Sequence, residues 1–349
     1  MKLGVLFGGV SSEHEVSVAS ACSIINHLNI EKYKIYPIYI SKKGNWYHVL
    51  EDMPKNSFGW LPKKIKKIKN VFQFLKKLDC VIPVFHGKYG EDGTIQGMLE
   101  MLNISYVGCN ILTSSICIDK VFTKYVLKNA GISVTPDLYI KYDNNKFCLV
   151  NDNFDYQEIS VLEIDKLIKN ELNYPVFVKP ARLGSSVGVI KVSDLNELID
   201  ALYNAKDLDY KILIEKAIVG KELECAILGS SASVVGQINS ADEFYSYDAK
   251  YNNSNSKTLI PASIDDEIMK KIQSIALKAA NVVDIKTIAR IDFFLEDNTN
   301  KIYLNEINTF PGFTDISMYP KLIEYGGVNF SELLDILINL ANCKKINNF

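Results

Sequence analysis

Two apolar runs near the C-terminus, ARIDFF at residues 289–294 and YLNEINTFPG at residues 303–312, decide the fold of this region and place its chemistry. They flank the Asx-rich connection 297–300, which is typical of a turn between two strands. The pattern predicts an antiparallel hairpin.

The face of this hairpin would carry an unusual set of polar side chains. Residues two apart on a strand point the same way, so Arg290 shares a face with Asp292, and Glu306 with Asn308. A closed turn brings Asp292 within about one register step of Glu306. Carboxylates that close need compensation, and a hard divalent cation such as Mg²⁺, which also binds nucleotide phosphates, provides it. The alternative is a surface hairpin with an ordinary Arg–Asp pair.

The composition is that of an ordinary globular protein. The 349 residues suffice for two or three domains, each with its own core. A net charge of −2 gives no general attraction to nucleic acid or anionic membrane, and no apolar run has transmembrane length. We therefore expect a cytoplasmic enzyme that neither binds nucleic acid nor inserts into membranes. The seven cysteines are scattered without a C-x-x-C pair, which predicts neither disulfides nor a zinc site.

The N-terminus predicts a doubly wound α/β domain. An apolar run at 2–7 ends in Gly8-Gly9 and leads into a helical pattern over about 16–28. The G-x-G-x-x-G pattern of dinucleotide-binding domains is absent. Glu13 has two interpretations: a favourable charge at a helix start, or a ligand-binding carboxylate at the C-terminal edge of a parallel sheet.

Helices are also predicted over two longer segments of the first 130 residues, besides a short one that ends near Leu102. Apolar residues at helical spacing over 63–77 predict an amphipathic helix whose lysines face solvent. A second helix, from Ser115 to about Asn129, would carry Lys120.

A Gly/Ser-rich loop, residues 181–189, joins predicted strands at 176–180 and 188–192. It is not a Walker loop, because Lys179 precedes it and no helix follows at once. It is either a flexible lid over phosphates or a plain hairpin turn. The polar segment 240–258, with its lysine and tyrosines, is typical of a binding loop.

Six motifs, in order along nearly the whole chain, resemble those of the D-alanine–D-alanine ligase family within the ATP-grasp superfamily. They are Gly8-Gly9 with Ser12-Glu13 and Glu15-Val16-Ser17, HGKYGEDG at 86–93, Lys179-Pro180 with GSSVG at 184–188, Lys250-Tyr251, Arg290-Ile291-Asp292, and NEINTFPGFT at 305–314.

The resemblance implies an α/β and α+β protein: an N-terminal doubly wound parallel-sheet domain followed by an ATP-grasp fold of two α+β lobes. We expect the first-substrate site in domain 1–115 and the phosphate lid in 116–210. The metal, oxyanion and second-substrate sites would lie in 211–349.

The resemblance also implies a reaction. ATP would phosphorylate the carboxylate of one D-alanine, and the amine of a second would attack the acyl phosphate to give D-alanyl-D-alanine for cell-wall peptidoglycan. Such catalysis is mainly positioning and charge stabilisation. Asp292, Glu306 and Asn308 match the family's ligands for Mg²⁺ or Mn²⁺, with two ions per site.

Residues on both sides of the glycine loop match the family's ATP contacts. Lys120 and Lys179 match its phosphate lysines, and Lys250 matches the lysine at the transferred phosphoryl group. Glu215 and Glu222 match groups at the adenine amine and the ribose, and the connection after Glu215 would offer main-chain contacts to the adenine edge. The complete predicted set is Lys120, Lys179, Ser185, Ser186, Glu215, Ala217, Ile218, Glu222, Lys250 and Phe294.

The catalytic and substrate residues follow from the same resemblance. Glu13 matches the carboxylate that holds the first ammonium group, and a Glu13–Ser185–Tyr251 hydrogen-bond link would close loop 240–258 over the site. Arg290 and the Gly312 N–H match the pair that stabilises the tetrahedral oxyanion. The catalytic set is Glu13, Ser185, Tyr251, Arg290, Gly312 and Ser317; the substrate set is Glu13, His86, Arg290, Gly312, Ser317 and Met318, with the last two at the second carboxylate.

Two alternatives are kept. D-serine-forming relatives usually carry Glu before the Lys-Tyr pair, so Ala249 favours D-alanine as second substrate, whereas Asp315 stands where an uncharged residue is expected. A nucleotide-binding regulatory protein with an inactive site is disfavoured by the complete set of metal and phosphate ligands. The expected partners are D-alanine, ATP and a second copy of the chain in a homodimer.

Overall fold

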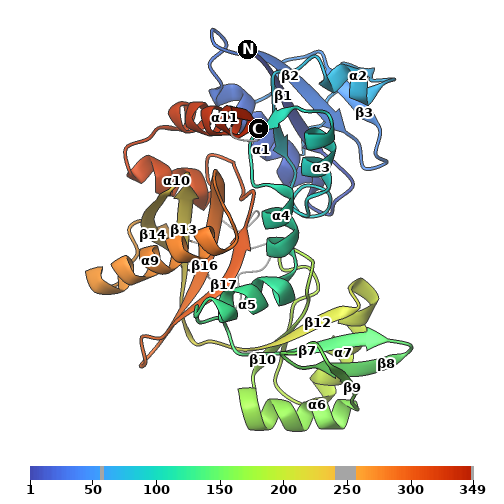
Figure 1. Cartoon of the computed structure of the whole chain (residues 1–349), viewed down its shortest axis with the longest axis vertical. Helices are drawn as coiled ribbons and strands as arrows, with labels where there is room; N and C mark the ends of the chain where they lie inside the picture. The colour runs from blue at the N-terminus through green and yellow to red at the C-terminus, as the bar shows by residue number, and fades with distance from the viewer. Residues whose placement is uncertain (56–58, 240–256, 347–349) are drawn as a thin grey trace.

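The computed structural model describes residues 1–55, 59–239 and 257–346, which form three sheets with helices packed on them (Figure 1). The first sheet lies at the top of Figure 1, the third at the left and the second at the lower right. No helix within these described ranges is long and apolar enough to cross a membrane.

The first sheet has the strand order β4-β3-β2-β1-β5-β6, and its central strand β1 runs parallel to β2 and β5. Leu3, Val5 and Phe7 pack on one side with α1 and α11, whereas Leu6 packs on the other with α3. Helices therefore cover both faces, and the doubly wound prediction is confirmed. The elements are β1 (Lys2–Gly8), α1 (His14–His27), β2 (Lys34–Ile40), β3 (Trp46–Val49), β4 (Ile65–Lys67), α2 (Val71–Leu75), β5 (Cys80–Val84), α3 (Thr94–Met101) and β6 (Ser105–Tyr106).

The amphipathic helix predicted over 63–77 is wrong. Its first part is the edge strand β4, which pairs antiparallel with β3, and its exposed lysines lie along that edge. The helix α2 begins only after Asn70, whose side chain accepts a hydrogen bond from the Gln73 N–H at 3.0 Å. Residues 65–67 pair with the open edge of β3, and this tertiary pairing outweighs the local preference for a helix.

The second sheet has the order β11-β10-β12-β7-β8-β9, and α6 and α7 pack on it. β10 and β11 form the hairpin predicted around the glycine loop, with Val176 opposite Val192. β12 pairs with β10 and β7, so this sheet extends to Lys216; the domain boundaries themselves stay a prediction. The elements are β7 (Asp137–Asp143), β8 (Lys146–Val150), β9 (Tyr156–Glu158), α6 (Val161–Leu167), β10 (Val176–Pro180), β11 (Ile190–Val192), α7 (Leu195–Leu208) and β12 (Lys211–Lys216).

The third sheet has the order β15-β14-β13-β16-β17. Leu223 and Cys225 on β13 pack on the α9 side, and Ala226 packs on the opposite side with α10. The elements are β13 (Gly220–Leu228), β14 (Ser231–Asn239), β15 (Lys257–Leu259), α9 (Asp266–Val282), β16 (Ile288–Glu296), β17 (Ile302–Asn308), α10 (Met318–Tyr325) and α11 (Phe330–Ile346).

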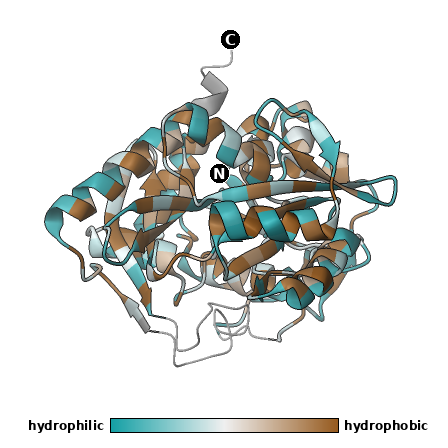
Figure 2. Cartoon of the chain, turned by 90° about the horizontal axis from the view of Figure 1, so that it is seen from below, coloured by the Kyte–Doolittle hydropathy of each residue, from teal (hydrophilic) through white to brown (hydrophobic). Residues whose placement is uncertain are grey.

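The chain then returns to its beginning. α11 contacts α1, β5 and β6, and Asp335 on α11 accepts a hydrogen bond from Tyr33 at 2.6 Å. The helices carry hydrophilic residues on one side and hydrophobic residues on the other, as buried cores require (Figure 2). This return path holds the loop 309–317 between the third sheet and α1.

The predicted helix over 115–129 is interrupted at Asp119. α4 (Ile111–Ile118) ends there, and α5 (Lys120–Asn129) begins at the next residue. The Asp119 carboxylate caps α5 by accepting hydrogen bonds from the N–H groups of Val121 and Phe122, at 3.1 and 3.2 Å. Lys120 is thereby placed in the first turn of a new helix.

Candidate active site

The hairpin β16–β17 carries the side chains of the predicted metal site, and a β-bulge decides which face they share. Phe293 pairs with Leu304, but Asp292 pairs with Glu306, so Asn305 is an extra residue on β17. Without it, Asp292 would face Asn305 and Glu306 would point to the other side. The hairpin prediction is confirmed; the bulge is an additional finding.

Three carboxylates form a row across the third sheet. Glu224 on β13 lies opposite Asp292, which lies opposite Glu306. The neighbouring row contains Arg290 opposite Asn308. Glu224 was not among the predicted site residues, although its position two residues after Glu222 on a strand placed it on the same face.

Arg290 compensates two of these charges. Its Nε and Nη2 donate to the two oxygens of Asp292, each at 2.7 Å, and its Nε lies 3.1 Å from Glu224 Oε2. Burial alone would lower the pKa of Arg290, but Asp292 and Glu224 outweigh it and hold this pKa well above its usual value. Asn308 Nδ2 also donates to Asp292, at 3.0 Å.

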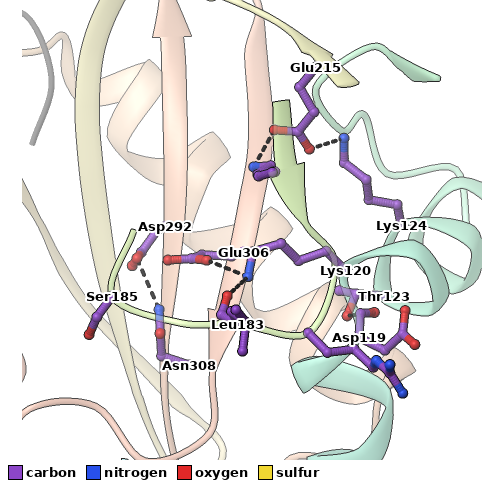
Figure 3. Close-up of polar contacts among 12 residues, drawn as sticks. Asp119, Lys120, Thr123, Lys124, Leu183, Ser185, Glu215, Asp292, Glu306 and Asn308 are labelled. Atoms are coloured by element: carbon purple, nitrogen blue, oxygen red, sulfur yellow. Dashed lines mark hydrogen bonds and ion pairs between the residues drawn. The ribbon is translucent and has the colours of Figure 1, made fainter. Parts of the chain in front are cut away.

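Lys120 joins the carboxylate row to the glycine loop. Its Nζ lies 3.5 Å from Glu306 Oε2 and donates to the Leu183 carbonyl at 2.8 Å (Figure 3). The loop 181–189 is therefore attached to α5 on one side. On the other side, the Ser185 hydroxyl donates to the Glu13 carboxylate of the first sheet.

The glycine loop adopts a backbone conformation that is unusual for serine. Ser185 and Ser186 have φ values of 50° and 59°, in the left-handed region. Strain of this kind concentrates at ligand clamps and active sites. Because tight hairpin turns also use positive φ, it is the contact of Ser185 with Glu13 that favours the lid interpretation.

One cleft, between the second and third sheets, contains most of the predicted nucleotide contacts. Ala217 is the exception: it does not line the cleft, and its N–H donates to the Pro175 carbonyl at 3.2 Å, so that main-chain donor is already used. Lys216, Glu224 and Asn305 line the cleft without having been predicted. The predicted residues that line it are Lys120, Lys179, Ser185, Ser186, Glu215, Ile218, Glu222, Phe294, Asp292 and Glu306.

Glu13 lies where the first sheet meets the lid. It is 7% exposed, at the start of α1. Gly87 approaches it closely from the loop after β5: a Cβ on Gly87 would stand 2.5 Å from Glu13 Oε2, and the φ of +69° also favours glycine. This burial favours the ligand-site interpretation of Glu13 over that of a helix-end charge.

His86 clamps the segment that carries Gly312. Its Nδ1 lies 3.1 Å from the Phe310 carbonyl, and its Nε2 lies 3.2 Å from the Ser20 hydroxyl. Ser20 Oγ also accepts the Phe313 N–H at 3.3 Å. Burial lowers the pKa of His86, so its neutral form fits these contacts, with Nδ1 as donor and Nε2 as acceptor.

Glu91 fastens the same two loops. Its carboxyl oxygens accept the N–H groups of Gly87 at 2.8 Å and Phe310 at 3.1 Å. Burial, and next the charge of Glu13, raise the pKa of Glu91 to about 8. Glu91 lies in the HGKYGEDG motif, but the sequence pattern predicted no role for it.

The raised pKa of Glu91 predicts a pH-dependent stability. The folded protein binds this proton more tightly than the unfolded chain. Its contribution is therefore full below pH 4.5, the ordinary value, and is lost as pH rises toward 8. We expect the free energy of unfolding of the native protein, relative to Glu91→Gln, to fall by at least about 1 kcal/mol between about pH 5 and 8. Urea denaturation at several pH values measures this, and a constant difference would contradict it.

The predicted second-substrate residues lie at the start of α10. Ser317 immediately precedes this helix, and its hydroxyl accepts the Thr314 N–H at 3.0 Å. Met318 is buried in the core shared with the first sheet. Asp315 accepts a hydrogen bond from Ser23 on α1, so its carboxylate is turned toward that helix. Ala249, Lys250 and Tyr251 lie outside the described residues.

The hairpin residues fit a hard cation. Asp292 and Glu306 stand opposite one another, and Asn308 uses its amide nitrogen toward Asp292, which leaves its oxygen on the same face. Carboxylate and amide oxygens are the donors that Mg²⁺ prefers. Within the described part of the chain, no three His, Cys, Asp or Glu side chains form a metal-binding group.

A cleft between two antiparallel sheets, with an acidic hairpin on one wall and a glycine–serine lid on the other, defines an ATP-grasp enzyme. Two family models match the chain: the D-ala D-ala ligase N-terminus over residues 2–109 and the D-ala D-ala ligase C-terminus over residues 126–339. A D-alanine--D-alanine ligase of Thermoanaerobacter sp. (strain X514) is 47% identical, covering 97% of this chain and 96% of the relative.

Two solved structures extend the comparison. The VanG D-Ala:D-Ser ligase of Enterococcus faecalis has a TM-score of 0.82 at 35% identity, covering 97% of this chain and 99% of that one. The D-alanine--D-alanine ligase of Bacillus anthracis complexed with ATP has a TM-score of 0.77 at 29% identity, with both chains covered fully, 100% each. The chain belongs to the D-alanine–D-alanine ligase family.

Proposed function

We propose that the protein uses ATP to join two D-alanine molecules into D-alanyl-D-alanine through an acyl phosphate, for peptidoglycan synthesis. The main support for this proposal is that three parts of the chain, distant in sequence, contact one another. The acidic hairpin, the lid and Glu13 of the first sheet are joined by the Lys120–Glu306, Lys120–Leu183 and Ser185–Glu13 contacts. A nucleotide site and a small amino-acid site would thus share one water-poor space.

The nucleotide would lie in the cleft between the second and third sheets. Lys120 and Lys179 would bind its phosphates, with Ser185 and Ser186 covering them from the lid. Asp292, Glu306 and Asn308 would hold Mg²⁺ or Mn²⁺, with two ions per site; when bound, the ions would neutralise charge on the transferred phosphoryl group. Lys250 is proposed at that group on sequence grounds alone.

The first D-alanine would bind with its ammonium on Glu13, whose carboxylate Ser185 and the Gly87 loop already orient. His86 would act by clamping the 310–313 segment and so placing the Gly312 N–H. With that N–H, Arg290 would stabilise the oxyanion formed when the second amine attacks. Tyr251 would complete the link from Glu13 and Ser185.

The second D-alanine would place its carboxylate at the start of α10, on Ser317 and the adjoining N–H groups, where the helix dipole favours an anion. Met318 would form an apolar wall beside it. D-serine as second substrate is not favoured, because curated relatives 40–47% identical over nearly the whole chain are D-alanine--D-alanine ligases. A homodimer, a cytoplasmic location and domain bounds at 115/116 and 210/211 stay predictions.

Competition between the two candidate substrates tests this proposal. With ATP, Mg²⁺ and equal D-alanine and D-serine, mass spectrometry should find D-alanyl-D-alanine in about tenfold or greater excess over the mixed dipeptide. A small apolar site gives discrimination of about this size between such similar molecules.

Two outcomes would contradict the proposal. A mainly mixed product would reassign the protein as a D-alanine–D-serine ligase. No phosphate release from ATP with D-alanine at saturating Mg²⁺ would favour the inactive regulatory protein.

A further inference from the structure

A buried lysine that the proposed reaction does not use lies directly behind the nucleotide cleft. Lys124 is one helical turn after Lys120 on α5, and its side chain is only 3% exposed. Its amine forms an ion pair with Glu215 (Figure 3). It also donates to the Thr135 carbonyl at 2.7 Å and lies 3.4 Å from Asp137 Oδ1. The Thr135 carbonyl accepts one of the three ammonium donors, and the two carboxylates supply the counter-charge.

Two carboxylates stand side by side at this place. Glu215 on β12 pairs directly with Asp137 on β7, and both side chains are more than nine-tenths buried, at 4% and 8% exposure. Directly opposed like charges are unfavourable on a sheet unless a cation lies between them. Lys124 is that cation, and Lys128 adds a second contact to Asp137 at 2.8 Å.

Glu215 divides its two oxygens between two lysines. Oε1 faces Lys124, and Oε2 faces Lys179, which lines the cleft. Burial would raise the pKa of Glu215, but the two ammonium groups outweigh burial and keep this pKa below its usual value. The carboxylate is therefore ionised and depends on both lysines.

This arrangement bears on how Lys179 could reach a phosphate. Turning its amine away from Glu215 would leave a buried carboxylate short of one counter-charge, which is costly. Lys124 cannot follow Lys179, because Asp137 and Thr135 hold it from behind. It therefore supplies a counter-charge that stays in place while Lys179 moves.

We propose that Lys124 is a positioning residue for the nucleoside triphosphate: it holds the Glu215 carboxylate at the cleft wall and keeps it balanced when Lys179 turns to the phosphates. The proposal rests on the proposed function in one respect, the contacts of Glu215 and Lys179 with ATP. Lys124 itself touches no substrate.

The variant Lys124→Met removes the charge with little change in shape. We expect the Kd for a non-hydrolysable ATP analogue, measured by calorimetry, to rise about tenfold or more, the usual effect of losing a charged hydrogen bond. In the ligation assay KM for ATP should rise similarly, while KM for D-alanine and kcat change less than about threefold. The preference for ATP over ITP, which lacks the adenine amine, should also shrink.

Three further variants separate positioning from general stability. Lys128→Met touches the same Asp137 but not Glu215, and should leave ATP affinity within about twofold. Lys124→Arg should restore most of the affinity. The pair Lys124→Met with Asp137→Asn removes one charge of each sign, which preserves folding if the single variant unfolds, and it too should bind ATP weakly.

Unchanged ATP affinity in both Lys124→Met proteins, or equal weakening in Lys128→Met, would overturn the proposal. The calorimetric measurement of nucleotide binding needs no D-alanine. A chain whose nucleotide affinity depends on Lys124 but which forms no dipeptide would therefore refute the proposed function and leave this inference standing.

Discussion

Replacing Arg290 by alanine is expected to lower kcat by about 100-fold or more while ATP still binds. Removing one donor from an oxyanion site has this size of effect, because the donor acts where charge develops. The Arg290 side chain is partly buried and is held by contacts with Asp292 and Glu224. Steady-state kinetics together with calorimetric ATP binding measure the two quantities separately.

Folding must be controlled in that experiment, because deleting the cation leaves two carboxylates opposite one another in the Glu224–Asp292 pair. Arg290→Lys keeps the charge but not the two-point contact with Asp292, and should recover folding without full activity. Arg182, the other arginine in the sequence, makes a similar two-point contact with Asp209, at 3.0 and 2.6 Å, and does not line the cleft. Arg182→Ala should therefore lower kcat less than about tenfold. Equal losses of kcat and ATP affinity in Arg290→Ala would refute the oxyanion role.

The second large effect is expected for Glu306→Gln. This change keeps the shape of the side chain but removes the charge that would hold a metal ion and pair with Lys120. We expect kcat to fall about 100-fold or more, and the Mg²⁺ concentration for half-maximal activity to rise. Titrating activity with Mg²⁺ at saturating ATP measures both.

A matched control lies on the same hairpin. Asp297 is in the exposed turn between β16 and β17, so Asp297→Asn removes one negative charge at a distance from the cleft. Its kcat and Mg²⁺ dependence should stay within about twofold of the native protein. A Glu306→Gln enzyme with unchanged Mg²⁺ dependence would argue against the metal site at this hairpin.

Turn residues and side-chain periodicity correctly predicted the elements whose formation depends on residues close in sequence. The hairpin around 297–300, the strand–glycine–helix start and the β10–β11 hairpin all follow from turn residues and side-chain periodicity, and all are observed. The helix over 63–77 was wrong for the opposite reason: whether Ile65 joins a strand depends on β3, a partner that spacing does not reveal. The break between α4 and α5 was not predicted, although Asp119 is a residue type that commonly caps the start of a helix.

The sequence by itself determined which residue types are available for the chemistry: paired carboxylates, an arginine, lysines before and after a glycine loop, and the order of the motifs that define the family. Only the tertiary structure decided how they meet. The bulge at Asn305 places Glu306 on the same face as Asp292. Ser185, in the loop of the second sheet, contacts Glu13 of the first sheet. Lys124 compensates the carboxylate pair on strands β12 and β7. The physical reason is that register and long-range contact depend on packing between segments distant in the chain, where a shift of one residue reverses every side chain.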